Sequence, residues 1–149
     1  MTWPAFLRRF KTLFTRQKPS APLDDSRQLG AWGEDVAAGF LEKRGFKILA
    51  RNYRRAGVKG EIDLIAWDRD TLVFVEVKTR RSEDVRVAES AVDWSKRRTL
   101  IRMARVYRRK ARAGQVYYRF DVVSVYPGQG GEPKVKYFPD AFRERRGPL

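Results

Sequence analysis

Acidic and basic side chains interrupt two hydrophobic stretches near the middle of the chain. The first stretch contains Asp63, and the second contains Glu76 and Lys78 two positions apart. Burying such charges costs free energy unless they are paired or bind a metal. Two convergent carboxylates, helped by a backbone carbonyl such as that of Val77, suit a hard divalent cation. Lys78 could then orient a water or neutralise developing charge, so the set contains the parts that metal-assisted phosphodiester hydrolysis needs.

The sequence around these charges predicts an antiparallel hairpin. Residues 61–67 and 71–78 are rich in Ile, Val, Leu and Phe, and the polar link 68–70 joins them. A metal site is not the only structure that fits this hairpin, because ion pairs between neighbouring strands are common at a sheet edge. The spacing alone does not separate the two interpretations.

Strict alternation of side chains makes a more detailed prediction about the hairpin. Glu76 and Lys78 should share one side of the second strand. On the first strand, Asp63 should lie on one side, and Ile62 and Leu64 on the other.

Composition narrows the possible chemistry. The 149 residues include no Cys and no His, which excludes disulfides, thiolate metal sites and every mechanism based on imidazole. Any metal should therefore be bound by oxygen, as Mg²⁺ or Mn²⁺ is. The formal charge of +15 favours a polyanionic partner, either nucleic acid or an acidic membrane surface. No apolar run reaches membrane-spanning length and no ordinary signal peptide is present, so the expected location is the cytoplasm.

Two helices should position the charges. Residues 26–44 predict the first, ending before Gly45, with Glu34 on the shoulder of its apolar stripe. Glu34 could reach over the edge of a sheet, or it could be an ordinary solvated side chain, and periodicity does not decide between them. A strand over 46–53 and a basic loop around Gly57 and Gly60 should follow; the loop suits phosphate contact but needs no such role.

The second helix should begin at a capping box formed by Ser90 and Asp93 and run to about Arg112. No acidic residue occurs from 96 through 112, whereas a solvated face normally mixes both signs. Repulsion between like charges one turn apart is relieved when an anion neutralises them, which favours contact with nucleic acid. The arginines that line up along one face are Arg98, Arg102, Arg105 and Arg109.

The remaining sequence predicts a strand over 117–126, a short edge strand over 135–138 and a charged tail over 143–149. Residues 1–27 form an extension to a domain that spans 28–142. Aromatic residues between 3 and 14 recur at helical spacing among basic residues. They fit an amphipathic helix that contacts a membrane surface or a protein partner, a helix folded onto the domain, or a disordered extension.

Five stretches of the sequence form a recognisable combination of motifs. They are Gly30-x-x-Gly33-Glu34 with Ala37, Arg51-Asn52-Tyr53-Arg54, Gly60-Glu61-Ile62-Asp63-Leu64-Ile65, Leu72-Val73-Phe74-Val75-Glu76-Val77-Lys78-Thr79-Arg80 and Arg119-Phe120-Asp121-Val122-Val123. In these stretches the chain resembles the YraN-like family of bacterial proteins, a branch of the PD-(D/E)xK nuclease superfamily related to Holliday-junction resolvases. Ile62 stands where the superfamily pattern has Pro.

This resemblance implies an α/β, restriction-endonuclease-like αβββαβ core with a central mixed sheet flanked by helices. It implies that Asp63 and Glu76 bind Mg²⁺ or Mn²⁺, that Lys78 is catalytic and that Glu34 assists the metal or its water; it leaves the role of Glu61 open. The function expected is a metal-dependent endonuclease acting on structured or branched DNA, and resolvase relatives would make it a homodimer. The alternative is a non-catalytic nucleic-acid-binding module on the same fold.

Overall fold

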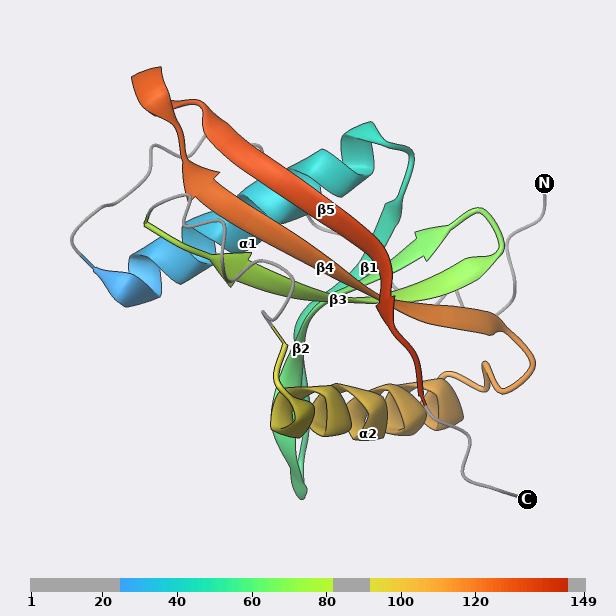
Figure 1. The fold of residues 1–149 in the computed structure, drawn as a ribbon. Helices are drawn as coiled ribbons and strands as arrows, with labels where there is room; N and C mark the ends of the chain where they lie inside the picture. Colours follow the sequence, from blue (N-terminus) through green and yellow to red (C-terminus); the bar gives the residue numbers. More distant parts are fainter. Residues whose placement is uncertain (1–24, 82–91, 145–149) are drawn as a thin grey trace.

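The computed structural model describes residues 25–81 and 92–144, which form a five-stranded mixed sheet with a helix on each side (Figure 1). This architecture confirms the predicted αβββαβ core, and a fifth strand extends it. The elements in chain order are α1 (Ser26–Lys43), β1 (Lys47–Arg55), β2 (Val58–Asp68), β3 (Thr71–Thr79), α2 (Trp94–Lys110), β4 (Tyr117–Pro127), the 3₁₀ turn η3 (Gln129–Gly131) and β5 (Pro133–Phe142).

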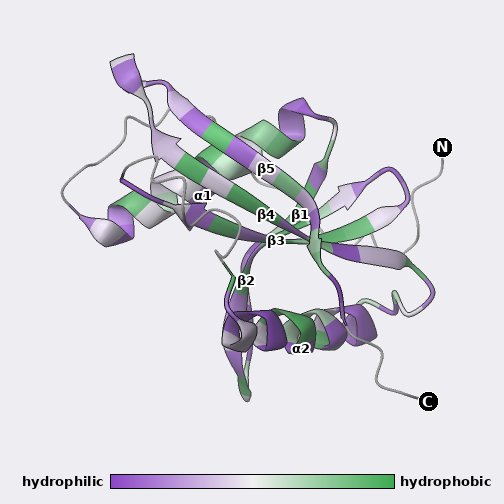
Figure 2. Cartoon of the chain, viewed as in Figure 1, coloured by the Kyte–Doolittle hydropathy of each residue, from purple (hydrophilic) through white to green (hydrophobic). Residues whose placement is uncertain are grey.

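Strand β3 lies at the centre of the sheet, whose order is β1-β2-β3-β4-β5. It pairs antiparallel with β2 and parallel with β4, and the parallel step requires a crossover that contains α2. Alternation along β3 matches the prediction: Leu72 and Phe74 join the core beneath α2, while Val73 and Val75 join the core beneath α1. Figure 2 shows hydrophobic segments interrupted by hydrophilic ones along the strands of the sheet.

Strand β2 departs from the alternation that its sequence predicts. Ile62 packs in the core beneath α2, whereas Leu64 packs in the core beneath α1. The prediction that both lie on one side is therefore wrong. The hairpin of β1 and β2 bends in this region and extends past α2 (Figure 1), and the bend turns the buried side of β2 toward that helix.

The prediction of a basic loop after β1 is also wrong, because most of these residues belong to the two strands of the bent hairpin. Strand β1 continues to Arg55 and β2 begins at Val58. The backbone carbonyl of Lys59, on the β2 arm, accepts a hydrogen bond of 2.9 Å from Arg102 Nη2 on α2. A Cβ atom on Gly60 would lie 2.3 Å from Thr99 Cγ2, so the hairpin and α2 are in close contact here. Tertiary packing, which a polar composition does not reveal, makes these residues strand.

Helix α2 begins later than predicted. Asp93 is its N-cap and accepts a hydrogen bond of 2.8 Å from Lys96 N, so the first helical residue is Trp94. The predicted partner in the capping box, Ser90, lies outside the described residues. The buried side of α2 includes Leu100 and Tyr107, as expected.

Helix α1 agrees with the prediction at both ends and approaches β3 very closely. It ends at Lys43, and Gly45 follows with φ 88°, the left-handed conformation expected after a helix C-terminus. On its buried side, a Cβ atom on Gly33 would lie 1.8 Å from Thr79 Oγ1 and 2.8 Å from Thr79 Cβ. The absence of a side chain at Gly33 therefore sets the distance between α1 and the end of β3.

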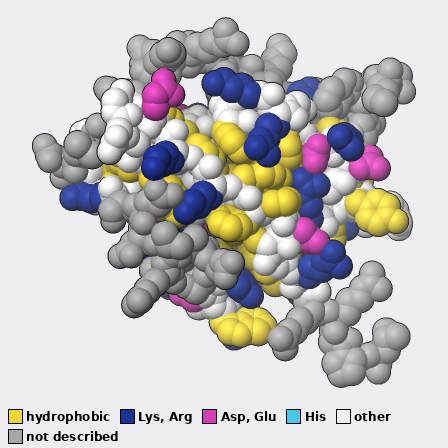
Figure 3. Space-filling view, turned by 45° about the horizontal axis from the view of Figure 1, so that its top comes forward, with side chains coloured by type: hydrophobic (Ala, Val, Ile, Leu, Met, Phe, Trp, Pro, Cys, Tyr) yellow, Lys and Arg dark blue, Asp and Glu magenta, His cyan; other side chains and the backbone are white. Residues whose placement is uncertain are grey.

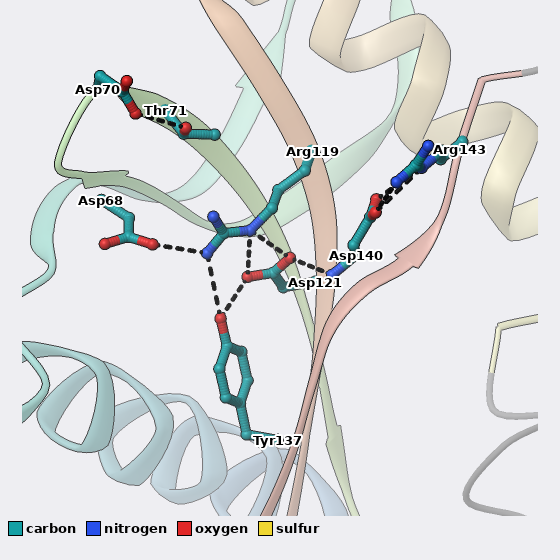
Figure 4. Close-up of polar contacts among 8 residues, drawn as sticks. All are labelled: Asp68, Asp70, Thr71, Arg119, Asp121, Tyr137, Asp140 and Arg143. Carbon is teal, nitrogen blue, oxygen red and sulfur yellow. Dashed lines mark hydrogen bonds and ion pairs between the residues drawn. The ribbon is translucent and has the colours of Figure 1, made fainter.

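A buried polar network fixes the other strands on the α1 side of the sheet (Figure 4). Asp121 on β4 is fully buried and accepts hydrogen bonds from Arg119 Nε at 3.0 Å, Tyr137 Oη at 2.6 Å and Asp140 N at 2.8 Å. Arg119 also pairs with Asp68 at 2.9 Å. These bonds join β2, β4 and β5. Asp140 lies at the irregularity in β5 between the strand pairs Phe120–Phe142 and Val122–Phe138.

Strand β5 is longer than the predicted edge strand 135–138, and the chain after it stays in contact with the domain: Glu144 pairs with Arg105 and accepts a hydrogen bond of 2.6 Å from Tyr118 Oη. Within the described ranges, neither helix is long and apolar enough to cross a membrane. The interpretations offered for residues 1–24 and for 145–149 concern parts of the chain outside the described residues.

Substitution of Gly33 by Ala should destabilise the fold by about 1–3 kcal/mol, because the new methyl group must push α1 away from Thr79. Gly39 provides a matched control on the same helix, since a Cβ atom there meets nothing within 4 Å. Gly39→Ala should leave stability unchanged or raise it by up to about 1 kcal/mol through helix propensity. Urea unfolding of both variants measures the difference, and equal stability of the two would contradict the close contact.

Candidate metal and nucleic-acid site

Asp63 lies where the pairing of β2 with β3 ends. The last paired residues are Leu64 and Val75. One residue further, Asp63 Oδ2 accepts a hydrogen bond of 2.7 Å from Val77 N, so the side chain takes the place of a backbone acceptor. The carboxylate is only 6% exposed. The end of the ladder thus points Asp63 across to β3, beside Glu76.

Glu76 is a buried carboxylate held between two ammonium groups. Its side chain is 3% exposed; Lys78 Nζ lies 3.0 Å from Oε1, and Lys96 Nζ lies 3.3 Å from Oε2. The contact with Lys78 was expected from their spacing on β3. Lys96 was not predicted as a site residue, since it comes from the first turn of α2 and only the packing of α2 against the sheet brings it here. Its one sequence signal is its position three residues after the N-cap Asp93.

The two carboxylates influence each other strongly. Burial, and then the negative charge of Glu76, raise the pKa of Asp63 from 3.8 to about 8, although the hydrogen bond from Val77 N and the charge of Lys96 act in the opposite direction. Burial of two such groups side by side is unfavourable for folding.

Glu34 and Glu61 line the same cleft but have other partners. Glu34 Oε2 accepts a hydrogen bond of 2.9 Å from Asn52 Nδ2, and burial raises the pKa of Glu34. Glu61 accepts a hydrogen bond of 2.7 Å from Arg54 Nε. Asn52 belongs to one of the family motifs, but the sequence predicts no role for it; the structure shows that its side chain donates a hydrogen bond to Glu34 on α1. The cleft has a volume of about 450 Å³ and also includes Asp63, Glu76, Lys78 and Lys96 in its lining.

The carboxylates of the cleft offer a limited set of oxygen ligands for a divalent cation. Among the described residues, no three acidic side chains gather closely enough to hold a metal by themselves. Asp63 and Glu76 do converge, and Glu76 Oε2 is buried without a hydrogen-bond donor. Mg²⁺ commonly binds through one or two carboxylates and takes its other ligands from water and substrate phosphates. The two carboxylates in an open cleft fit that mode, and they do not form a closed protein cage.

The predicted arginine face of α2 is exposed, but its four members differ. Arg102 donates to the carbonyl of Lys59, and Arg105 pairs with Glu144. Arg98 and Arg109 have no polar partner in the described part of the chain. Glu144 thus supplies the negative charge that the helix sequence lacks, and it neutralises part of the row.

Positive charge is not confined to α2. Figure 3 shows Lys and Arg side chains spread around an apolar area on the face that it displays. Net charge alone therefore does not locate an interface. The row on α2 is distinguished by its position, because the first turn of the same helix brings Lys96 into the cleft.

Comparisons with known proteins agree on one family. The model of Uncharacterised protein family UPF0102 matches residues 33–125, a range that includes every cleft residue named above from Glu34 to Lys96. A UPF0102 protein of Syntrophotalea carbinolica is 44% identical over 114 residues, which are 76% of this chain and 90% of the relative. Those of Solibacter usitatus and Symbiobacterium thermophilum are 46% and 44% identical, over 76% and 78% of this chain and 84% and 98% of their own lengths.

The raised pKa of Asp63 predicts how stability depends on pH. The folded state binds the proton more tightly than the unfolded state, so metal-free wild type should lose stability as pH rises from about 4 to about 8. Asp63→Asn keeps an acceptor for Val77 N but cannot ionise. Its melting temperature in EDTA should exceed that of wild type most at pH 8 and least at pH 5.

Glu42→Gln is the matched control for this comparison, because Glu42 is an exposed carboxylate on α1. Its melting temperature should differ from that of wild type by the same small amount at both pH values. If the melting temperature of Asp63→Asn exceeds that of wild type by the same amount at pH 5 and pH 8, the raised pKa of Asp63 is contradicted.

Proposed function

The chain belongs to UPF0102, the YraN-like family within the PD-(D/E)xK nuclease superfamily, and from that premise we propose that it is a divalent-cation-dependent endonuclease acting on structured or branched DNA. One observation carries the proposal: Asp63 and Glu76 converge in an open cleft with the ammonium of Lys78 beside them. Those side chains suit phosphodiester hydrolysis without any imidazole, which this chain lacks.

Asp63 and Glu76 are the residues that would hold Mg²⁺ or Mn²⁺. The ion would supply Lewis-acid polarisation of a phosphoryl oxygen and a bound water of lowered pKa. Val77 N keeps the Asp63 carboxylate turned toward the cleft. Because this donor is part of the backbone of β3, the orientation does not depend on a flexible side chain.

Lys78 is the proposed catalytic lysine. Its ammonium lies at the mouth of the site, 3.0 Å from Glu76, where it can donate a hydrogen bond to the attacking water or to a non-bridging phosphate oxygen. As the oxygen of water bonds to phosphorus and the bond to the leaving oxygen breaks, negative charge grows on the phosphate, and a fixed ammonium stabilises it.

Glu34 is proposed to accept a hydrogen bond from water in the cleft. It lines the same cavity, and Asn52 holds one of its oxygens. Because Asn52 contacts Oε2 of Glu34, the other oxygen, Oε1, is the one proposed to accept a hydrogen bond from water. Burial raises the pKa of Glu34, and a carboxylate of raised pKa is a better proton acceptor.

The exposed face of α2 is the proposed substrate surface. Arg98 and Arg109, the two ends of the row on α2, are 11 residues apart, so the row extends about 17 Å along the helix. Backbone phosphates would contact Arg98, Arg102, Arg105 and Arg109, and these contacts carry no base sequence. Such binding suits recognition by shape, as expected for a structured or branched DNA.

A second candidate is a nucleic-acid-binding module without catalytic activity. It is favoured by the observation that no three acidic side chains gather in the described residues and that lysines already neutralise Glu76. This candidate uses the same helix face and needs no metal.

Cleavage assays separate the two candidates. Wild type should cut labelled junction or flap DNA in Mg²⁺ or Mn²⁺ and not in EDTA, and Asp63→Asn or Lys78→Met should lower the rate by about 10²-fold or more, since each removes a group that acts on the reacting phosphate. Binding of the same DNA by each variant, measured in EDTA, shows that the surface remains intact. Metal-independent binding with no cleavage of any substrate by wild type would favour the binding module.

The unequal pairing of the arginines predicts unequal losses of affinity. Arg98→Gln should weaken DNA binding uniformly across sequences and reduce the slope of log affinity against log salt by about 1. Arg105→Gln should have a smaller effect, because Arg105 is already neutralised by Glu144. Fluorescence anisotropy over a range of salt concentrations measures both, and equal losses would show that Glu144 releases Arg105 in the complex.

A further inference from the structure

The two ammonium groups at Glu76 are held in different ways. Lys78 lies two residues from Glu76 on the same face of β3, and its Nζ is 3.0 Å from Oε1. Lys96 reaches the carboxylate from α2, and its Nζ is 3.3 Å from Oε2. Oε2 accepts no hydrogen bond although it is buried, so Lys96 is held by charge without hydrogen-bond geometry. The longer contact, made from a separate element, makes Lys96 the more easily displaced of the two ammonium groups.

A divalent cation at Asp63 and Glu76 would compete with these ammonium groups. A divalent ion repels a nearby ammonium group more strongly than a single positive charge does. Lys78 shares its strand with Glu76, which keeps its ammonium beside the carboxylate. Lys96 has a long, flexible stem on a different element, and its ammonium can move within the cleft that it lines.

We propose, building on the function proposed above, that Lys96 has two alternating partners. In the metal-free protein it neutralises Glu76, and when a divalent cation binds Glu76 it turns to a phosphate of the bound nucleic acid. The inference rests on the placement of Lys96 on α2, whose outer face carries Arg98 and Arg102. The released ammonium would continue the arginine row into the cleft, so the binding of metal would complete the phosphate-binding surface.

The first test is the affinity for Mn²⁺ in the absence of nucleic acid, measured by calorimetry. Lys96→Met removes the competing charge and should bind Mn²⁺ about tenfold more tightly than wild type, a change equivalent to about 1.4 kcal/mol. Lys110→Met is the matched control: it removes an exposed lysine at the other end of the same helix and should leave the Mn²⁺ affinity unchanged. Lys96→Arg restores a cation and should return the affinity toward that of wild type.

The second test is the affinity for a fluorescent duplex oligonucleotide, measured with Ca²⁺ and with EDTA, while a gel verifies that the strands stay intact. Lys96→Met should weaken binding several-fold in Ca²⁺ and leave it unchanged in EDTA, because Lys96 is held by Glu76 when no metal is bound. A purely structural lysine would weaken binding equally in both conditions, and that result would overturn the inference. Lys96→Gln serves as a second neutral variant if Lys96→Met does not fold.

The calorimetric experiment also separates this inference from the proposed function. If wild type binds no Mn²⁺, the metal site is wrong and the inference falls with it. If wild type binds Mn²⁺ and Lys96→Met binds it equally or more weakly, the alternation of Lys96 is wrong while the metal site stands.

Discussion

The burial of two carboxylates at the end of the β2–β3 ladder is the constraint on which the site depends. Asp63 and Glu76 are almost inaccessible to solvent, and such charges are unfavourable in the interior unless donors and cations surround them. The protein supplies a backbone N–H for Asp63 and the ammonium groups of Lys78 and Lys96 for Glu76. These contacts offset part of the cost of burying the two carboxylates.

Each layer of the fold brings one part to that point. Helix α1 can lie against the end of β3 because Gly33 has no side chain, and this contact places the next residue, Glu34, in the cleft. On the other side of the sheet, α2 packs against the bent arm of β2 near Gly60, and its first turn then delivers Lys96. The network around Asp121 joins β2, β4 and β5 on the α1 side of the sheet.

Helix α2 connects catalysis and substrate binding in this proposal. Its inner side completes the core, its first turn contacts Glu76 and its outer side carries the arginines. The contact of Arg105 with Glu144 shows that a row of positive charge in a sequence is not automatically a free surface, because residues distant in the chain can neutralise part of it. The family match covers residues 33–125, from the middle of α1 through most of β4, and includes the acidic and lysine side chains of the cleft from Glu34 to Lys96.

The sequence by itself predicted the two hydrophobic strands, both helices and the shared side of Glu76 and Lys78 on one strand, because periodicity and short spacing are local properties of the chain. The fold class followed from the family resemblance that the sequence motifs carry. Only the tertiary structure decided that Lys96 joins Glu76 and that Asn52 holds Glu34, since each pair joins elements that are separate in the sequence. It also decided that Ile62 and Leu64 face opposite cores and that the basic residues after β1 form strand. The bend of the hairpin against α2 causes both departures, and a bend produced by packing leaves no periodic signal in the residues that undergo it.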